Sequence, residues 1–217
     1  MTLRLYYHPL ASFCWKPLIA LYEKNTPFEK VLVDLGDPES RASFFKVWPI
    51  GQFPVLVDTA SDKLVPASSA IIDYLNLMDS GADRLIPENP EMAMQVRRWD
   101  RFLDDYVHVP MQKIVGDVLR GAGQKDPTGV AEARSMLARA YGVLEASIGN
   151  PWFLGEPFTM ADCAAAPALF YANKVAPFKD FPAVSAYLKR LEARPAFAKV
   201  LLEAEPYFQY FPYKGET

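Results

Sequence analysis

Side chains that could carry enzyme chemistry are few in this sequence and widely spaced. The thiols are Cys14 and Cys163, and the imidazoles are His8 and His108. Structural zinc sites use closely spaced pairs of these residue types, so the spacing here predicts no metal site. A secreted disulfide framework would need more cysteine, so we expect no disulfide either.

Glycine motifs of common cofactor and hydrolase sites are also missing from the sequence. The segment Gly121–Gly123 continues into Gln124-Lys125-Asp126, so Asp126 stands where a dinucleotide-binding fingerprint needs its third glycine, and no strand pattern precedes it. No Gly-x-Ser-x-Gly turn of serine hydrolases occurs, and no phosphate-binding loop ends in Lys-Ser or Lys-Thr. We therefore expect none of these chemistries.

Two positions have residue types that suit ligand binding at a helix end and along a backbone. Ser68 begins a segment with helical spacing, so its hydroxyl can cap that helix, and the free N–H groups at the positive helix end can receive a carboxylate. Capping alone, without a ligand, is the alternative interpretation. Pro54 opens a strand pattern, where its missing N–H costs least.

The elements that position these residues change period repeatedly over residues 1–78. The spacing of apolar residues predicts a strand, a helix, a strand, a short helix, a hairpin of two strands and a helix, over Leu3–Tyr7, Trp15–Lys24, Phe28–Val33, Ser40–Lys46, Pro54–Val57, Lys63–Val65 and Ser68–Leu77. The first two strands should pair in parallel because a helix connects them.

From residue 90 onward, every predicted element is a helix. Apolar spacing predicts helices over Glu91–Leu119, Ala131–Ile148, Thr159–Asn173, Pro182–Glu192 and Pro195–Ala204. Pro110 and Pro167 lie inside two of them and are expected to cause kinks. The polar, helix-breaking stretch 79–83 and the prolines after it predict a linker over residues 79–89, which separates a domain 1–78 from a domain 90–217.

Two features of the helical half are expected to be structural. Thr159 and Asp162 have the spacing of a capping box, with Phe158 as the apolar residue before it, so Asp162 is not expected to be catalytic. The tail Pro206–Tyr213 is too aromatic for a free chain end. We expect this tail to pack on the body of the protein, near the mouth of a pocket.

Charge and hydropathy limit the expected partners. The 217 residues carry 23 Lys and Arg against 26 Asp and Glu, without the positive excess that phosphate binding requires, so nucleic acid is not an expected partner. The most apolar run, Cys163–Ala172, contains Pro167 and is too short to span a bilayer, so no membrane helix is expected. The N-terminus lacks a secretory leader pattern, and we expect a cytoplasmic protein.

Three motifs, in their order along the chain, resemble those of the cytosolic glutathione transferases. Leu5–Pro9 followed by Ser12–Lys16 looks like the family's first strand, active-site loop and first helix. Trp48–Leu56 is similar to its Asn-Pro-x-Gly-Lys-Val-Pro-x-Leu segment, and Pro66–Leu75 to its Glu-Ser-x-Ala-Ile-x-x-Tyr-Leu segment. This resemblance covers essentially the whole chain. It implies the fold class α/β + all-α, with a thioredoxin-like βαβ-ββα domain that binds glutathione and an all-helical domain with an acceptor-substrate pocket.

The resemblance also implies glutathione as cosubstrate, without a metal, and a set of residues that bind it: Ser12, Gln52, Phe53, Pro54, Ala67 and Ser68. In the family, the bond before the proline is cis, the backbone of Phe53 pairs with the cysteinyl backbone, and Ser68 receives the γ-glutamyl carboxylate. Ala67 departs from the usual Glu and Gln52 from a frequent Lys, so one hydrogen-bond acceptor and one charge toward glutathione are missing.

The start of the first helix is where the family activates the glutathione sulfur, by lowering the pKa of the thiol. Ser12 is the first candidate, as a hydroxyl that donates to the thiolate, although counting back from Ile19 puts Ala11 at the usual serine position. Cys14 is the second, either as a reactive thiol of lowered pKa or as an inert buried cysteine. Because Pro17 is tolerated only near a helix start, we expect the helix to begin no earlier than Cys14, with Ser12 in the loop.

The function that this resemblance implies is transfer of the glutathione thiolate to a small hydrophobic electrophile, as in detoxification, by a homodimer. Tyr106, His108 and Met111 are the expected acceptor-pocket residues. One alternative is a glutathione-dependent isomerase, because Ser12–Lys16 partly resembles the Ser-Cys-x-Trp-Arg stretch of maleylacetoacetate isomerases. Another is a non-catalytic binding protein on the same scaffold, which the missing glutamate at Ala67 favours.

Overall fold

The N-terminal part of the chain forms a four-stranded mixed sheet in the computed structural model, which describes residues 3–78, 81 and 84–213. Its strands are β1 (Leu3–Tyr7), β2 (Phe28–Leu32), β3 (Val55–Asp58) and β4 (Lys63–Pro66), in the order β2-β1-β3-β4. β1 pairs in parallel with β2 and antiparallel with β3, and β3 and β4 form the hairpin. The predicted βαβ-ββα order is confirmed, because α1 (Ser12–Glu23) connects the parallel pair.

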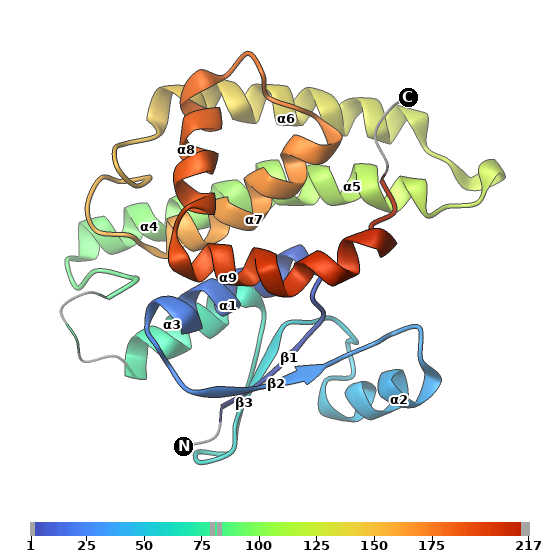
Figure 1. Cartoon of the computed structure of the whole chain (residues 1–217), viewed down its shortest axis with the longest axis vertical. Helices are drawn as coiled ribbons and strands as arrows, with labels where there is room; N and C mark the ends of the chain where they lie inside the picture. The colour runs from blue at the N-terminus through green and yellow to red at the C-terminus, as the bar shows by residue number, and fades with distance from the viewer. Residues whose placement is uncertain (1–2, 79–80, 82–83, 214–217) are drawn as a thin grey trace.

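The alternation along β1 sends its side chains to two different layers. Leu3 and Leu5 are fully buried in the large core shared with α1 and α3 (Ser68–Met78). Tyr6 points the other way and packs against Phe44 of α2 (Pro38–Val47), with ring centroids 6.0 Å apart. Figure 1 shows α1 and α3 between the sheet and the helical half, with α2 set apart from them.

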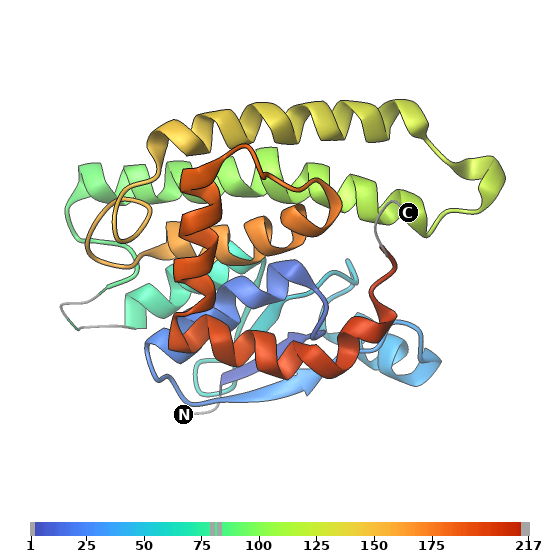
Figure 2. The same cartoon turned by 45° about the horizontal axis from the view of Figure 1, so that its top comes forward.

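The rest of the described chain is helical, as predicted. The elements are α4 (Pro90–Leu103), a π-helical turn η1 (Asp104–His108), α5 (Val109–Val118), η2 (Ala122–Gln124), α6 (Pro127–Ser147), α7 (Met160–Val175), α8 (Pro182–Glu192), α9 (Pro195–Ala204) and η3 (Glu205–Tyr210). α4, η1 and α5 run on as one long rod beside α6 (Figure 2). α7 lies at the centre and packs against both α1 and α4, so the two halves share one apolar core.

The predicted linker 79–89 is only partly within the described residues, since 79, 80, 82 and 83 lie outside them. The C-terminal part of this linker packs into the core of the protein. Leu85 is 5% exposed and Ile86 2% exposed, and both belong to the shared core. The backbone carbonyl of Leu85 also accepts a hydrogen bond from Met160 N at 2.9 Å, which ties this segment to the start of α7.

The expected start of the first helix was wrong. α1 begins at Ser12, and Pro17 is its sixth residue, inside the helix. A proline in a helix interior costs about 3 kcal/mol. Burial offsets this cost, because every residue from Cys14 to Leu21 is buried and α1 packs against α3, α7 and α9.

Kinks were expected at Pro110 and Pro167 in the helical half, and the structure shows that the helix continues past the proline in both places. Pro110 is the second residue of α5, which follows directly on η1, so the chain stays helical and forms a π turn just before the proline. Pro167 lies within α7, which runs unbroken from Met160 to Val175. Tertiary packing holds α7 together across Pro167, since α7 is buried along almost its whole length.

The structural assignments in the helical half are confirmed. Asp162 accepts hydrogen bonds from Thr159 N at 2.8 Å and from Tyr187 Oη at 2.6 Å, which makes it a buried cap. The aromatic tail packs on the body, with Phe208 against Trp15 and Phe211 only 8% exposed. Among the described helices, none has the length and apolar content needed to cross a membrane.

Candidate active site

The loop between β1 and α1 is held in place by both halves of the molecule. Trp15, fully buried, donates its indole N–H to the carbonyl of Pro9 at 2.7 Å. Tyr171 of α7 donates its hydroxyl to the carbonyl of Leu10 at 3.0 Å. The loop closes on itself through Ala11 N and the carbonyl of His8 at 2.9 Å. The start of α1 is therefore a fixed point where the two halves meet.

The segment before β3 brings its backbone to the same region. The peptide bond between Phe53 and Pro54 is cis, as the family resemblance implied. Gly51 has φ +71°, and a Cβ there would overlap the ring of Phe45, so this turn requires glycine. These two features hold the backbone of Phe53 at the edge of a cavity.

The start of α3 contains a strained residue. Ala67 has φ +70°, in the left-handed region that costs an L-residue about 1–2 kcal/mol. Its carbonyl accepts a hydrogen bond from Ile71 N at 3.0 Å, so Ala67 closes the first turn of α3, and Ser68, 5% exposed, begins it. Such strain concentrates at functional sites, and Ala67, Ser68 and Ser69 all line the same cavity.

One cavity of about 430 Å³ collects these features, and we name it the cis-proline cavity. It is lined by parts of α1, the segment before β3, the start of α3 and the α4–η1 junction: Phe13, Trp48, Ile50, Gln52, Phe53, Pro54, Pro66, Ala67, Ser68, Ser69, Arg101, Asp104, Asp105 and Val109. Arg101 and Asp105 form an exposed ion pair in this lining, with the guanidinium 3.0 Å from both carboxylate oxygens.

A second cavity, of about 330 Å³, opens beside the same helix start, and we name it the Met111 cavity. Its lining is largely apolar and comes from the β1–α1 loop, α5, α7 and the tail: Leu10, Ala11, Ser12, Met111, Gln112, Val115, Gly116, Tyr171 and Phe211. The start of α1 thus lies between the two cavities, of which only the cis-proline cavity has charged side chains in its lining.

Beneath the cis-proline cavity lies a fully buried ammonium group. Lys16, with no exposed surface, makes ion pairs at 2.7 Å with Asp100 and with Asp104. It also donates to Ser69 Oγ at 3.0 Å, and Ser69 donates to Asp100 Oδ2 at 2.7 Å. Because Ser69 and Asp104 also line the cis-proline cavity, this cluster joins α1, α3 and α4 directly under the candidate site.

The two carboxyl groups of this cluster are shifted in opposite directions. Burial raises the pKa of Asp100 above its usual range, and the neighbouring Asp104 raises it further. Burial acts on Asp104 as well, but the neighbouring His108 and Lys16 outweigh it and hold the pKa of Asp104 below its usual range. Of the two carboxyl groups around the single ammonium group, Asp104 is therefore the one that ionises more readily.

Of the three expected acceptor residues, one lines a cavity of the candidate site, and Tyr106 and His108 line neither of its two cavities. Met111 lines the cavity named after it. His108 is fully buried and stacked on Phe13 at 3.9 Å between ring centroids, and burial lowers its pKa, so it is a core residue and not part of a cavity wall. Tyr106 is 45% exposed and packs against Phe102 on the rod surface.

The two candidates for sulfur activation differ in access. Cys14 is completely buried, and burial raises the pKa of its thiol to about 12, which opposes the expected role as a thiolate. Ser12 is 5% exposed and is the first residue of α1, not a loop residue. Ser12 lines the Met111 cavity, whereas its neighbour Phe13 lines the cis-proline cavity.

Sequence reasoning missed the Lys16 cluster, although the sequence contains a signal for it. Lys16 is the one charged residue in the apolar run from Trp15 to Leu21. Asp100 and Asp104 are four residues apart, so they share a face of the predicted helix with buried neighbours. An unpaired lysine on a buried face predicts carboxylates on whichever helix packs against it.

The fold and site together define a class of protein: a thioredoxin-like domain with a cis-proline segment, fused to a helical domain that completes the site. The family model described as "Glutathione S-transferase, N-terminal domain" matches residues 5–81, and "Glutathione S-transferase, C-terminal domain" matches residues 127–190. The chain belongs to the cytosolic glutathione transferase family, and the protein is a transferase.

Individual relatives agree with this assignment. A glutathione S-transferase of Silene vulgaris is 31% identical over 216 residues, covering 93% of this chain and 97% of its own. A dichloromethane dehalogenase of Methylorubrum extorquens is 31% identical, covering 89% of this chain and 72% of its own. The solved structure of a Methylobacillus flagellatus glutathione S-transferase with glutathione bound has a TM-score of 0.82 at 23% identity, covering 91% of this chain and 98% of that one, and shows the same fold.

Proposed function

We propose that the cis-proline cavity binds glutathione as a cosubstrate and that the protein adds its thiolate to a small hydrophobic electrophile in the Met111 cavity. The observation that carries this proposal is the meeting of both cavities at the start of α1. A thiol bound in the first cavity, with its sulfur at this helix end, reaches an apolar molecule bound in the second.

The glutathione contacts follow from the cavity lining. The γ-glutamyl carboxylate binds at the start of α3, where Ser68 and the free N–H groups donate to it. The backbone of Phe53 pairs with the cysteinyl backbone, and Gln52 borders the same groove. Ala67 has no acceptor for the α-ammonium group, and Asp105, whose side chain is 45% exposed in the same lining, takes that role.

The sulfur is activated by the positive end of α1. Ala11 is the N-cap residue and provides no side-chain cap. Cys14 N donates to the Ala11 carbonyl at 2.8 Å, so the N–H groups of Ser12 and Phe13 are the ones left for an anion. Ser12 adds a hydroxyl at this end and is the proposed donor to the thiolate. Cys14 is not the reacting group, because its thiol is buried and its pKa is raised.

The test is the pH profile of glutathione conjugation to 1-chloro-2,4-dinitrobenzene. Ser12→Ala should lower kcat at neutral pH by about 10–1000-fold and shift the acidic limb of the profile upward, while glutathione binding is unchanged. Cys14→Ala is the matched control, two residues further along α1 and fully buried, and should leave the profile in place. An unshifted profile in Ser12→Ala, with a glutathione adduct on Cys14, would reverse the assignment.

A second candidate function is a non-catalytic glutathione-binding protein. Ala11 at the N-cap and Ala67 before α3 are the observations that favour it, since both positions lack a polar side chain toward the ligand. The same assay separates the two functions: glutathione binding without turnover of any aryl halide, epoxide or enone supports the binding protein.

A further inference from the structure

One imidazole of the chain, His8, has no part in the proposed glutathione contacts. It directly follows β1, at the start of the loop that leads into α1, and it is partly exposed. His8 touches one wall residue of each cavity. Its ring is stacked on Phe53 of the cis-proline cavity, with centroids 6.3 Å apart. Its Nδ1 accepts the backbone N–H of Leu10, which lines the Met111 cavity, at 3.2 Å.

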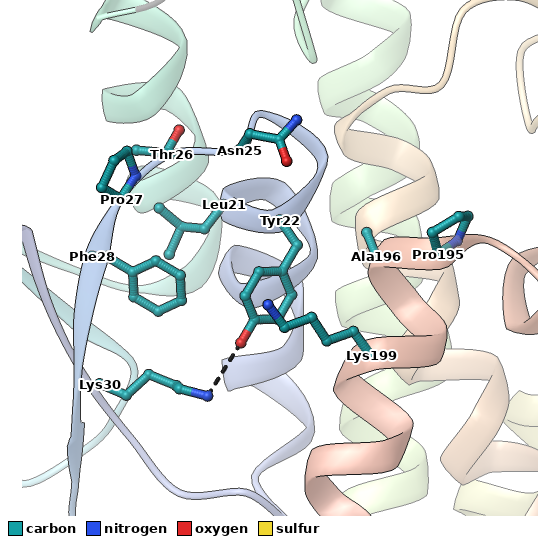
Figure 3. A pocket seen from close by; sticks show the side chains of 10 residues that line it. All are labelled: Leu21, Tyr22, Asn25, Thr26, Pro27, Phe28, Lys30, Pro195, Ala196 and Lys199. Carbon is teal, nitrogen blue, oxygen red and sulfur yellow. Dashed lines mark hydrogen bonds between the residues drawn. The ribbon is translucent and has the colours of Figure 1, made fainter.

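The aromatic tail holds the His8 ring from another side. Tyr207 of η3 meets it edge-on, with centroids 5.9 Å apart and ring planes 75° apart. A polar cluster just before η3 fixes this contact. Glu203, in the last turn of α9, accepts from the Tyr22 hydroxyl at 2.8 Å and from Lys30 at 2.8 Å. Figure 3 shows Lys30 donating to the same hydroxyl, so the end of α9 is tied to α1 and β2.

These contacts decide which nitrogen of His8 carries a proton. Burial lowers the pKa of His8 below its usual 6.5, although the neighbouring Asp34 acts in the opposite direction, so the ring is mainly neutral at neutral pH. A neutral imidazole that accepts a hydrogen bond at Nδ1 has its proton on Nε2. Within the described residues, no acceptor binds this Nε2–H. His8 is therefore a fixed ring with one free donor, next to the loop before α1.

We propose that His8 determines which electrophiles the protein accepts, by donating its Nε2–H to the oxygen of an α,β-unsaturated carbonyl compound that extends from the Met111 cavity. This inference rests on the proposed function and names a substrate class for it. The thiolate sulfur forms a bond to the β-carbon, and the electron pair of the C=C bond moves so that negative charge develops on the carbonyl oxygen. The α-carbon then takes a proton from water, and the proton that the glutathione thiol released neutralises the hydroxide.

The place where charge develops explains why this class would benefit. A hydrogen-bond donor accelerates a reaction when it binds the transition state more strongly than the bound substrate. In an enone, the attack increases the negative charge on the oxygen, so the Nε2–H bond strengthens as the reaction proceeds. A benzyl halide releases a halide ion and has no such oxygen. The rings of Phe53 and Tyr207 shield the imidazole in part from water, which strengthens the bond further.

The experiment compares 4-phenyl-3-buten-2-one with benzyl chloride as acceptors for glutathione. Both contain a phenyl ring, but only the enone has the oxygen. His8→Phe keeps an aromatic ring against Phe53 and removes the donor, so kcat/KM for the enone should fall by about tenfold, while kcat/KM for benzyl chloride stays within about twofold. His8→Gln places an amide N–H near the Nε2 position and should recover most of the enone rate. The matched control is Tyr207→Phe, which removes the neighbouring hydroxyl and should change neither rate.

Three results would overturn the inference and leave the proposed function standing. An unchanged enone rate in His8→Phe would show that the donor does not reach the substrate. Equal losses for both compounds would show that His8 has only a structural role. A loss of the enone rate in Tyr207→Phe, without one in His8→Phe, would place the donor on the tyrosine. A native chain that binds glutathione and conjugates neither compound would instead refute the proposed function, and this inference with it.

Discussion

Replacing Lys16 with methionine tests whether the buried cluster holds the two halves together. The methionine fills a similar volume but removes the ammonium group that lies 2.7 Å from both Asp100 and Asp104. Two carboxyl groups then remain buried beside each other without a cation. Removing one partner of a buried ion pair costs about 3–5 kcal/mol, because the other partner stays desolvated and uncompensated.

This cost converts into a measurable shift. For a chain of this length, 1 kcal/mol corresponds to about 2–4 °C in unfolding temperature, so Lys16→Met should unfold about 6–20 °C below the native chain. Urea unfolding at 25 °C, followed by tryptophan fluorescence, gives the free energy directly, and Trp15 next to the cluster reports on it. The control is Lys46→Met on the exposed surface of α2, which should stay within about 0.5 kcal/mol.

The pH dependence distinguishes lost charge from lost packing. In Lys16→Met, the pKa values of Asp100 and Asp104 in the folded state rise above their unfolded values, so ionisation of the carboxyl groups opposes folding. The destabilisation caused by the ionised carboxyl groups is absent below about pH 4, where they are protonated, and it grows as pH rises. The difference in stability between variant and native chain should therefore shrink as pH falls from 7 toward 4. A difference that is constant with pH, or a stability equal to that of Lys46→Met, would refute the reasoning.

The remaining predictions concern single features. Ala67→Glu should tighten glutathione binding by restoring an acceptor, and unchanged affinity in a titration would place that contact elsewhere, as at Asp105. Hydrogen bonds from Tyr74, Ser61 and Ala60 N lower the pKa of Asp58 from 3.8 to about 2, so its contribution to stability is present above about pH 4 and lost as pH falls toward 2. Urea unfolding of Asp58→Asn between pH 2 and 6 should lack this loss, and an identical pH dependence would contradict it. The chain should sediment as a homodimer, and a mass near 24.4 kDa at micromolar concentration would exclude this.

Most of the fold could be predicted from the sequence because local periodicity follows burial. The strand Leu3–Tyr7 and the helices Pro182–Glu192 and Pro195–Ala204 have the predicted bounds. The start of α1 could not be predicted, because the position of Pro17 in the helix is decided by packing against α3, α7 and α9, which no local pattern contains. The π turn at Asp104–His108 likewise packs against α6 and α7, and no local pattern contains those contacts.

The parts of the candidate site that depend on local backbone geometry could be predicted from the sequence. The parts that depend on which side chains are buried could not. The cis bond before Pro54 and the helix start at Ser68 follow from short motifs. The burial of Cys14 and His108 depends on residues from the other half of the chain, so neither could be known from its neighbours in sequence.

The measurement that tests the central claim most directly is a calorimetric titration of glutathione into the native chain and into Ser68→Ala. The account predicts one glutathione per chain, no competition from Cys-Gly, which lacks the γ-glutamyl group, and binding at least about tenfold weaker in Ser68→Ala, because a hydrogen bond to a charged group is lost. An absence of binding to the native chain, or equal affinity for the variant, would contradict the assignment of the cis-proline cavity as the glutathione site.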